Sequence, residues 1–230
     1  MEFDFVMAAQ NGATRVLRYN SHTSELSGFT PTDVSEFSVA PRVSKDAPLG
    51  KSKKIDVLKI QMGLSCNYAC SYCSQAFQIH EAAISKMTDV DTFLGNLDNW
   101  LESEPSQIEL WGGEPFVYWA KIKKLIPALK EKYPNATFGI ITNGSLFDRE
   151  KIDFIKKHDI GITISHDGPG QDVRGPDPLD DPEKRNWIET LIKERPNKVG
   201  INAVLTKNNY KLEEIRQWFR RELGDDIALS

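Results

Sequence analysis

The chain has 230 residues, of which 40% are hydrophobic and 27% charged, and its formal net charge is −4. This composition is ordinary for a soluble globular protein, and the negative balance argues against binding nucleic acid through bulk electrostatics. No apolar run is long enough to cross a bilayer, and the amino-terminal residues lack the basic start and apolar stretch of a signal peptide. We therefore expect a cytoplasmic protein without a membrane partner.

The first part of the chain differs from the rest and predicts a small amino-terminal extension. The run Thr14–Tyr19 is typical of a short strand, and a return near Leu26–Phe29 would complete a hairpin. A proline-containing loop follows and ends in three lysines, which we interpret as a solvated linker. The expected division is a hairpin and linker over residues 1–54 and a main domain over residues 55–230.

In the main domain, β-type runs alternate with segments of helical period. The expected strands are Val57–Met62, Gln107–Trp111, Thr137–Thr142, Ile160–Ser165 and Lys198–Leu205. Apolar residues at helical spacing mark the expected helices, around Val90–Leu97, Ile122–Leu129, Ile152–Ile155, Ile188–Ile192 and Leu212–Leu223. Strands and helices that alternate in this way form right-handed βαβ units and a parallel sheet. The predicted fold class is therefore α/β, and the residues after Gly224 read like the start of a sixth strand.

The predicted strands have one apolar face and one small or polar face. In the strand Ile160–Ser165, three isoleucines alternate with Gly161, Thr163 and Ser165. A parallel sheet that is covered on both faces would be apolar on both. We expect the isoleucine face to pack on helices, and the other face to line the concave side of a curved, barrel-like sheet that holds a polar cofactor. A solvent-exposed face is the alternative.

The three cysteines of the chain lie within eight consecutive residues, directly after the first strand of the main domain. A disulfide framework would instead distribute an even number of cysteines along a secreted chain. Cys66, Cys70 and Cys73 can ligate three irons of a [4Fe–4S] cluster and leave the fourth iron open to a substrate or cofactor. A zinc site is the alternative; zinc generally takes four ligands, and His80 could be the fourth.

Polar motifs follow the next strands at the ends where (β/α) barrels gather their active sites. Gly-Gly-Glu-Pro occupies residues 112–115, Thr-Asn-Gly residues 142–144, and Ser-His-Asp-Gly-Pro residues 165–169. The paired glycines allow the backbone to approach a ligand closely. Arg174 offers a forked donor suited to a carboxylate, although a surface ion pair with Asp172 or Asp177 is an equal alternative. His166 falls on the isoleucine face and is expected to be structural.

The cysteine loop, the aromatic residue before its third cysteine and the strand-end motifs together resemble the radical S-adenosylmethionine (SAM) superfamily over about residues 55–224. The resemblance implies a partial (β/α)6-type radical SAM barrel with parallel strands and a short amino-terminal extension. It also implies that SAM chelates the open iron and that one-electron reduction cleaves SAM to methionine and a 5′-deoxyadenosyl radical.

The same resemblance implies which residues contact SAM. The paired glycines and Glu114 would lie at its methionine end, Asn143 nearby, and Ser165 and Arg174 at its carboxylate. The strand near Asn202 and the Tyr72 backbone would face the ribose and adenine. The implied SAM contacts are therefore Tyr72, Gly112, Gly113, Glu114, Asn143, Ser165, Arg174, Asn202 and Val204.

The stretch from Ser165 to Arg174 is closest in pattern to the anaerobic sulfatase-maturating and other peptide-modifying, SPASM-type members. That likeness implies a peptide or protein substrate and a flavodoxin- or ferredoxin-type electron donor. The chain looks truncated after the fifth βα unit, without the cysteine-rich carboxyl-terminal domain of those members. Two alternatives stay open: a radical SAM enzyme acting on a small molecule or nucleotide, and a cluster-binding fragment without catalysis.

Overall fold

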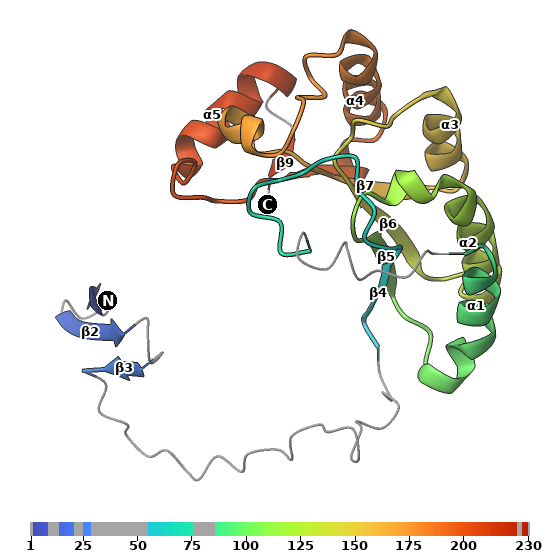
Figure 1. Cartoon of the computed structure of the whole chain (residues 1–230), viewed down its shortest axis with the longest axis horizontal. Coiled ribbons are helices and arrows are strands. Elements are labelled where there is room, and N and C mark those ends of the chain that lie inside the picture. Colours follow the sequence, from blue (N-terminus) through green and yellow to red (C-terminus); the bar gives the residue numbers. More distant parts are fainter. Residues whose placement is uncertain are drawn as a thin grey trace. The chain divides into compact units, whose positions relative to one another are not determined.

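The computed structural model describes residues 2–8, 14–20, 25–28, 55–75, 86–224 and 227–229 (Figure 1). The chain divides into two compact units, Met1–Leu49 and Gly50–Ser230. Each unit has its own sheet, and the two sheets differ in the direction of their strands.

The first unit is an antiparallel sheet of β1 (Glu2–Ala8), β2 (Thr14–Asn20) and β3 (Glu25–Ser27), in that order. The predicted hairpin corresponds to β2 and β3, and β1 is an additional strand that pairs with β2 over its whole length. An exposed ion pair joins these two strands, with Arg18 Nε 2.7 Å from Asp4 Oδ1. The predicted lysine-rich linker lies outside the described residues.

The second unit contains a sheet of parallel strands that follow one another in sequence order, as predicted. The strands are β4 (Val57–Gln61), β5 (Gln107–Trp111), β6 (Thr137–Thr142), β7 (Ile160–Ser165), β8 (Val199–Asn202) and β9 (Ala228–Leu229). The prediction extended β8 to Leu205, but the strand ends at Asn202 because the Val204 N–H instead donates a hydrogen bond to the Asp167 carboxylate. The short β9 confirms the expected sixth strand and pairs with β8.

Helices follow the strands and lie along the outer side of the curved sheet (Figure 1). They are α1 (Thr88–Trp100), α2 (Trp119–Lys132), α3 (Arg149–Lys157), α4 (Pro182–Glu194) and α5 (Leu212–Leu223). The side chains of Asp148 and Asp181 accept hydrogen bonds from the first backbone N–H groups of α3 and α4, which favours helix initiation at those positions. None of the helices in the described ranges is long and apolar enough to span a membrane.

The apolar face of the sheet packs into the core under these helices. In β7 the side chains of Ile160, Ile162 and Ile164 are at most 2% exposed, while the residues between them are partly exposed. Burying one such side chain contributes about 2 kcal/mol. A slip of one residue would turn all three isoleucines to the other face, so their burial fixes the register of β7.

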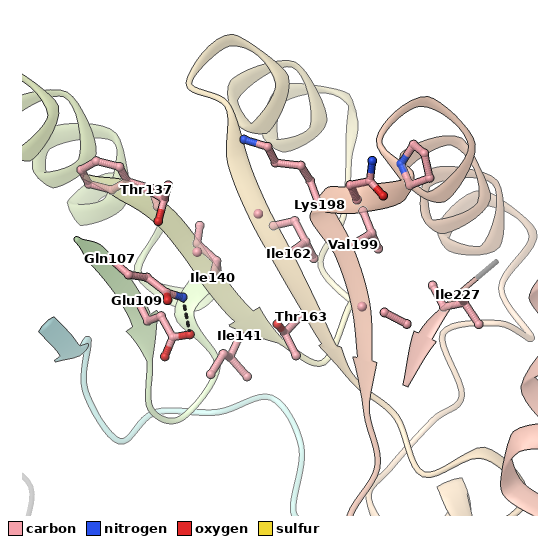
Figure 2. Close-up of a pocket in the computed structure, with 17 residues that line it drawn as sticks. Gln107, Glu109, Thr137, Ile140, Ile141, Ile162, Thr163, Lys198, Val199 and Ile227 are labelled. Carbon is pink, nitrogen blue, oxygen red and sulfur yellow. Dashed lines mark hydrogen bonds between the residues drawn. The ribbon is translucent and has the colours of Figure 1, made fainter. Parts of the chain in front are cut away.

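The opposite, inner face of the sheet borders a cavity of about 720 Å³ (Figure 2). Glu109, Gly139 and Gly161 stand side by side on β5, β6 and β7, so two of three neighbouring positions carry no side chain. Glu109 accepts a hydrogen bond from the Gln107 side chain (2.8 Å) and forms an ion pair with Lys59 on β4 (3.1 Å). The small and polar positions of the strands thus line a hollow, as the sequence predicts for a concave face.

At two glycines an added Cβ would contact no other atom. Substituting alanine at these positions therefore measures the conformational preference of the backbone without a change in packing. Gly95 lies inside α1, whereas Gly224 follows α5 with φ +94°. We expect Gly95→Ala to raise the free energy of unfolding by about 1 kcal/mol, because alanine has the higher helix propensity. Gly224→Ala should lower it by roughly 1–2 kcal/mol, because a side chain disfavours positive φ. Urea denaturation measures the free energy of unfolding of both variants. Changes of the same sign would contradict the helical conformation of Gly95 or the positive φ of Gly224.

Candidate functional site

The cysteine loop follows β4 and lies across the carboxyl ends of the neighbouring strands. Cys66 is exposed, and Cys70 and Cys73 are partly buried. All three line one cavity of about 530 Å³. Burial raises the pKa of the Cys66 and Cys70 thiols, and the nearby Arg174 opposes that rise at Cys70. Thiolates in such a setting need a cationic partner, which a bound metal would supply.

The described side chains of the site do not form a compact single-ion site. Among the residues that the structure places, no three His, Cys, Asp or Glu side chains converge closely enough to hold one metal ion. A cubane cluster takes its three thiolates on three different irons, so it does not require that convergence. His80, the fourth ligand of the zinc alternative, lies outside the described residues.

The Gly-Gly-Glu turn after β5 contacts the cysteine loop rather than open space. A Cβ added to Gly113, which has φ +51°, would lie 2.2 Å from the Ser65 carbonyl oxygen. The Glu114 N–H donates to that same oxygen (3.0 Å), and the Gly113 N–H donates to the Gln75 side chain (2.9 Å). The sequence predicts a close approach to a ligand here; the structure shows that the glycine is required for a close approach to the cysteine loop.

The Glu114 carboxylate connects the ends of β5 and β6. The residue is 1% exposed, and its oxygens accept hydrogen bonds from the Phe116 N–H (3.0 Å), the Thr142 hydroxyl (2.8 Å) and the Asn143 N–H (2.7 Å). Burial raises the pKa of Glu114, while these donors oppose the rise. Its oxygens are therefore engaged with the protein, and a contact of Glu114 with SAM stays a prediction.

Asn143 links the end of β6 to the cysteine loop. Its amide donates to Asn67 Oδ1 (2.9 Å), and Asn67 in turn donates to the Ser145 hydroxyl (2.8 Å). The Ser145 hydroxyl donates back to Asn143 Oδ1 (2.6 Å). This closed set of hydrogen bonds holds the residue next to Cys66 against the turn after β6.

Arg174 is buried and faces Asp167. It is 9% exposed, and its Nη1 lies 3.3 Å from Asp167 Oδ1 and 2.6 Å from the Tyr72 hydroxyl. The expected alternative, an ion pair with Asp172 or Asp177, is wrong: Asp177 pairs with His166 (2.8 Å). His166 is 1% exposed and stacks on Trp218, which confirms its structural role.

Sequence reasoning did not single out Asp167 or the side chain of Tyr72. Asp167 is fully buried, and its Oδ2 accepts from the Tyr72 hydroxyl (2.5 Å). Burial and the contact with Asp167 raise the pKa of Tyr72 far above its usual range. The available signal was the position of Asp167 in the Ser-x-Asp-Gly-Pro motif, but its partners lie far away along the chain.

Arg174 also retains an unused donor. Its Nε is buried without a hydrogen-bond partner among the described residues, and the side chain lines the cysteine cavity. A buried polar atom without a partner calls for a ligand or an ordered water. A carboxylate in the cavity would satisfy it, so this residue fits the carboxylate of SAM.

The remaining predicted residues reach the same cavity from the next strands. Ser165 and Asn202 stand side by side at the ends of β7 and β8, and Val204 follows at the rim, 38% exposed. The structure therefore brings every predicted site residue to one cavity, whose lining includes Cys66, Cys70, Tyr72, Cys73, Gly112, Gly113, Glu114, Asn143, Ser165, Arg174, Asn202 and Val204. Ile141 on β6 lines both this cavity and the inner-face cavity.

Comparison with known proteins agrees with this arrangement. The family description "Radical SAM superfamily" matches residues 60–219. The chain belongs to the radical SAM superfamily, whose enzymes use a [4Fe–4S] cluster and SAM.

The individual proteins that the chain resembles share about a quarter or less of its residues over the matched regions. The chain is 25% identical over 175 residues to the radical SAM cyclopropyl synthase TigE of Paramaledivibacter caminithermalis, covering 69% of this chain and 37% of TigE. It is 27% identical over 150 residues to an uncharacterized protein of Methanocaldococcus jannaschii, covering 63% and 51%. The solved structure of anSMEcpe with bound SAM matches with TM-score 0.60 and 21% identity, covering 76% of this chain and 50% of that one. The chain thus spans about half or less of the length of these proteins.

The close approach of Gly113 to the cysteine loop predicts a local defect. Gly113→Ala should lower the free energy of unfolding by about 2 kcal/mol, because it adds strain at positive φ and a clash with Ser65. It should also reduce the iron bound after anaerobic reconstitution. Gly139→Ala is the matched control, since its Cβ would lie 3.6 Å from Glu109. Equal stability and iron content in both variants would contradict the role assigned to Gly113.

Proposed function

We propose that this chain forms the core of a radical SAM enzyme that cleaves SAM reductively and modifies a peptide or protein substrate. The observation that carries the proposal is the cavity of about 530 Å³ in which the three cysteines face a buried arginine with an unused donor. Cofactor pockets have volumes of this order. When bound, the cluster and SAM supply a 5′-deoxyadenosyl radical that abstracts hydrogen from the substrate.

The residues of the chain bind and orient these groups. Cys66, Cys70 and Cys73 would hold the [4Fe–4S] cluster and would leave one iron without a protein ligand, to which SAM could bind. Arg174 would donate a hydrogen bond to the carboxylate, and Ser165 lines the same cavity. The turn from Gly112 to Glu114 and Asn143 border the methionine end. The Tyr72 backbone, Asn202 and Val204 would border the ribose and adenine.

The inner face of the sheet offers space for a substrate next to the cysteine cavity. Ile141 lines both this cavity of about 720 Å³ and the cysteine cavity, and the positions of Gly139 and Gly161 add no side chain to the hollow. The order of motifs from Ser165 to Arg174 favours a peptide. A solved structure of anSMEcpe, named as holding SAM and the Cp18Cys peptide, matches the fold with TM-score 0.59 and 22% identity.

The proposal includes the setting of the enzyme. A flavodoxin- or ferredoxin-type protein would supply the electron to the cluster, and Cys66 is the most exposed of the three cysteines that would hold it. Free thiols and a cluster of this kind persist in a reducing compartment, which supports a cytoplasmic location. We also propose that residues 1–54 are an extension outside the catalytic core of residues 55–230.

Reductive cleavage of SAM tests the proposal directly. Anaerobically reconstituted chain should bind about four irons and, with dithionite, convert SAM to 5′-deoxyadenosine detected by chromatography. Cys70→Ser should abolish the product, because one iron loses its ligand. One zinc per chain in place of iron would support the zinc site. Iron-loaded protein that binds SAM without cleaving it would be a cluster-binding fragment and would refute the enzyme.

The inner cavity predicts a variant in which SAM cleavage is uncoupled from substrate modification. Gly161→Val places a side chain in the hollow, and the nearest atoms to its Cβ are 3.5 Å away. Because valine favours strands, stability and substrate-free SAM cleavage should remain unchanged. The extra 5′-deoxyadenosine formed with a peptide pool from a digested cell extract should fall about tenfold, corresponding to 1.4 kcal/mol.

The control for that experiment is a metabolite pool from the same extract. Stimulation of the wild-type chain by peptides and not by metabolites supports the peptide substrate. Stimulation by metabolites alone would favour the enzyme acting on a small molecule or nucleotide.

A further inference from the structure

Asp167 joins three separate segments of the site. Its carboxylate accepts hydrogen bonds from the Tyr72 hydroxyl (2.5 Å) and the Val204 N–H (2.9 Å), and Arg174 Nη1 lies 3.3 Å away. Tyr72 belongs to the cysteine loop, Arg174 follows β7, and Val204 follows β8. One fully buried side chain thus connects the loop that carries the cysteines to both flanking strand ends.

The hydrogen bonds around Asp167 have a defined direction. A guanidinium can only donate, so Arg174 Nη1 donates to the Tyr72 oxygen (2.6 Å). The Tyr72 hydroxyl then donates its own hydrogen to Asp167, which as a carboxylate only accepts. The charges of Arg174 and Asp167 compensate each other in a buried place where a single charge would be costly.

The nitrogens of the Arg174 guanidinium differ in whether they have a hydrogen-bond partner. Its Nη1 is held by Tyr72 and Asp167, whereas its buried Nε has no partner in the described chain. A flexible arginine that is fixed on one side presents its other side to a ligand in one orientation, and such preorganisation raises affinity.

We propose that Asp167 and Tyr72 are positioning residues that hold the free Nε of Arg174 at a fixed distance from the cysteine loop, so that SAM reaches the open iron and the arginine together. The inference rests on the proposed function. Tyr72 immediately precedes Cys73, and a second link between the same segments runs from the Ser71 N–H to the Val173 carbonyl (2.9 Å). The two points that SAM must contact therefore cannot move independently.

The test compares two nucleosides on the reconstituted full chain by equilibrium dialysis. SAM carries the amino and carboxylate groups, and 5′-methylthioadenosine lacks both. Tyr72→Phe should weaken SAM binding about tenfold and Asp167→Asn about tenfold to a hundredfold, as for loss of a hydrogen bond to a buried charge. Methylthioadenosine binding should change less than about twofold. The amide oxygen introduced by Asp167→Asn can still accept from the Val204 N–H.

A double-mutant cycle separates positioning from direct contact. In an Arg174→Ala background, Tyr72→Phe should have no further effect on SAM affinity, because Tyr72 acts through Arg174. Tyr133→Phe is the control, since it removes the hydroxyl of a buried tyrosine that does not line the cavity, and it should leave SAM affinity unchanged. If Asp167→Asn does not fold, Tyr72→Phe keeps the Asp167–Arg174 pair and carries the test.

Three results would overturn the inference. Unchanged SAM affinity in Tyr72→Phe and Asp167→Asn, or additive effects in the cycle, would show that Arg174 needs no such support. Equal weakening of SAM and methylthioadenosine would show a general loosening of the site. In each case a wild-type chain that binds SAM leaves the proposed function standing, whereas wild-type protein that binds neither nucleoside would overturn both.

Discussion

The position of the cysteine loop depends on the hydrogen bonds that it forms with the segments at the ends of the neighbouring strands. The loop has no regular secondary structure of its own between β4 and α1 over its described residues. The turn after β5 holds it at Ser65, the turn after β6 at Asn67, and the segment after β7 at Ser71 and Tyr72. Each of these strand-end motifs therefore fixes the cysteine loop relative to the sheet.

Much of the fold could be predicted from the sequence because burial imposes a period on the residues. The isoleucines of β7 and the alternating residues of β8 show directly which face is covered. The motifs converge because parallel strands end at the same edge of a sheet. That rule can be applied without knowing any contact between residues. The predicted residues do all line one cavity. Their individual contacts with SAM stay predictions.

Other features depended on pairs of residues that no local pattern connects. Asp167 and Tyr72 are 95 positions apart, and neither has a periodicity that indicates the other. The strand β8 ends earlier than predicted because the Val204 N–H donates its hydrogen bond to the Asp167 carboxylate and not to a neighbouring strand. The strand β1 was missed although Phe3 and Phe5 alternate with acidic residues, and its described side chains are exposed. The contact of Gly113 with Ser65 depends on the path of the loop.

The shared wall at Ile141 has a chemical consequence. Ile141 lines both the cavity of the cysteines and the hollow on the inner face of the sheet. Under the proposed function, a reactive carbon radical formed in the cysteine cavity would have this alkyl side chain in the wall beside it. A thiol or a phenol at that position would surrender a hydrogen atom far more readily and end the reaction on the protein. An aliphatic residue at this position would therefore make such self-inactivation slower.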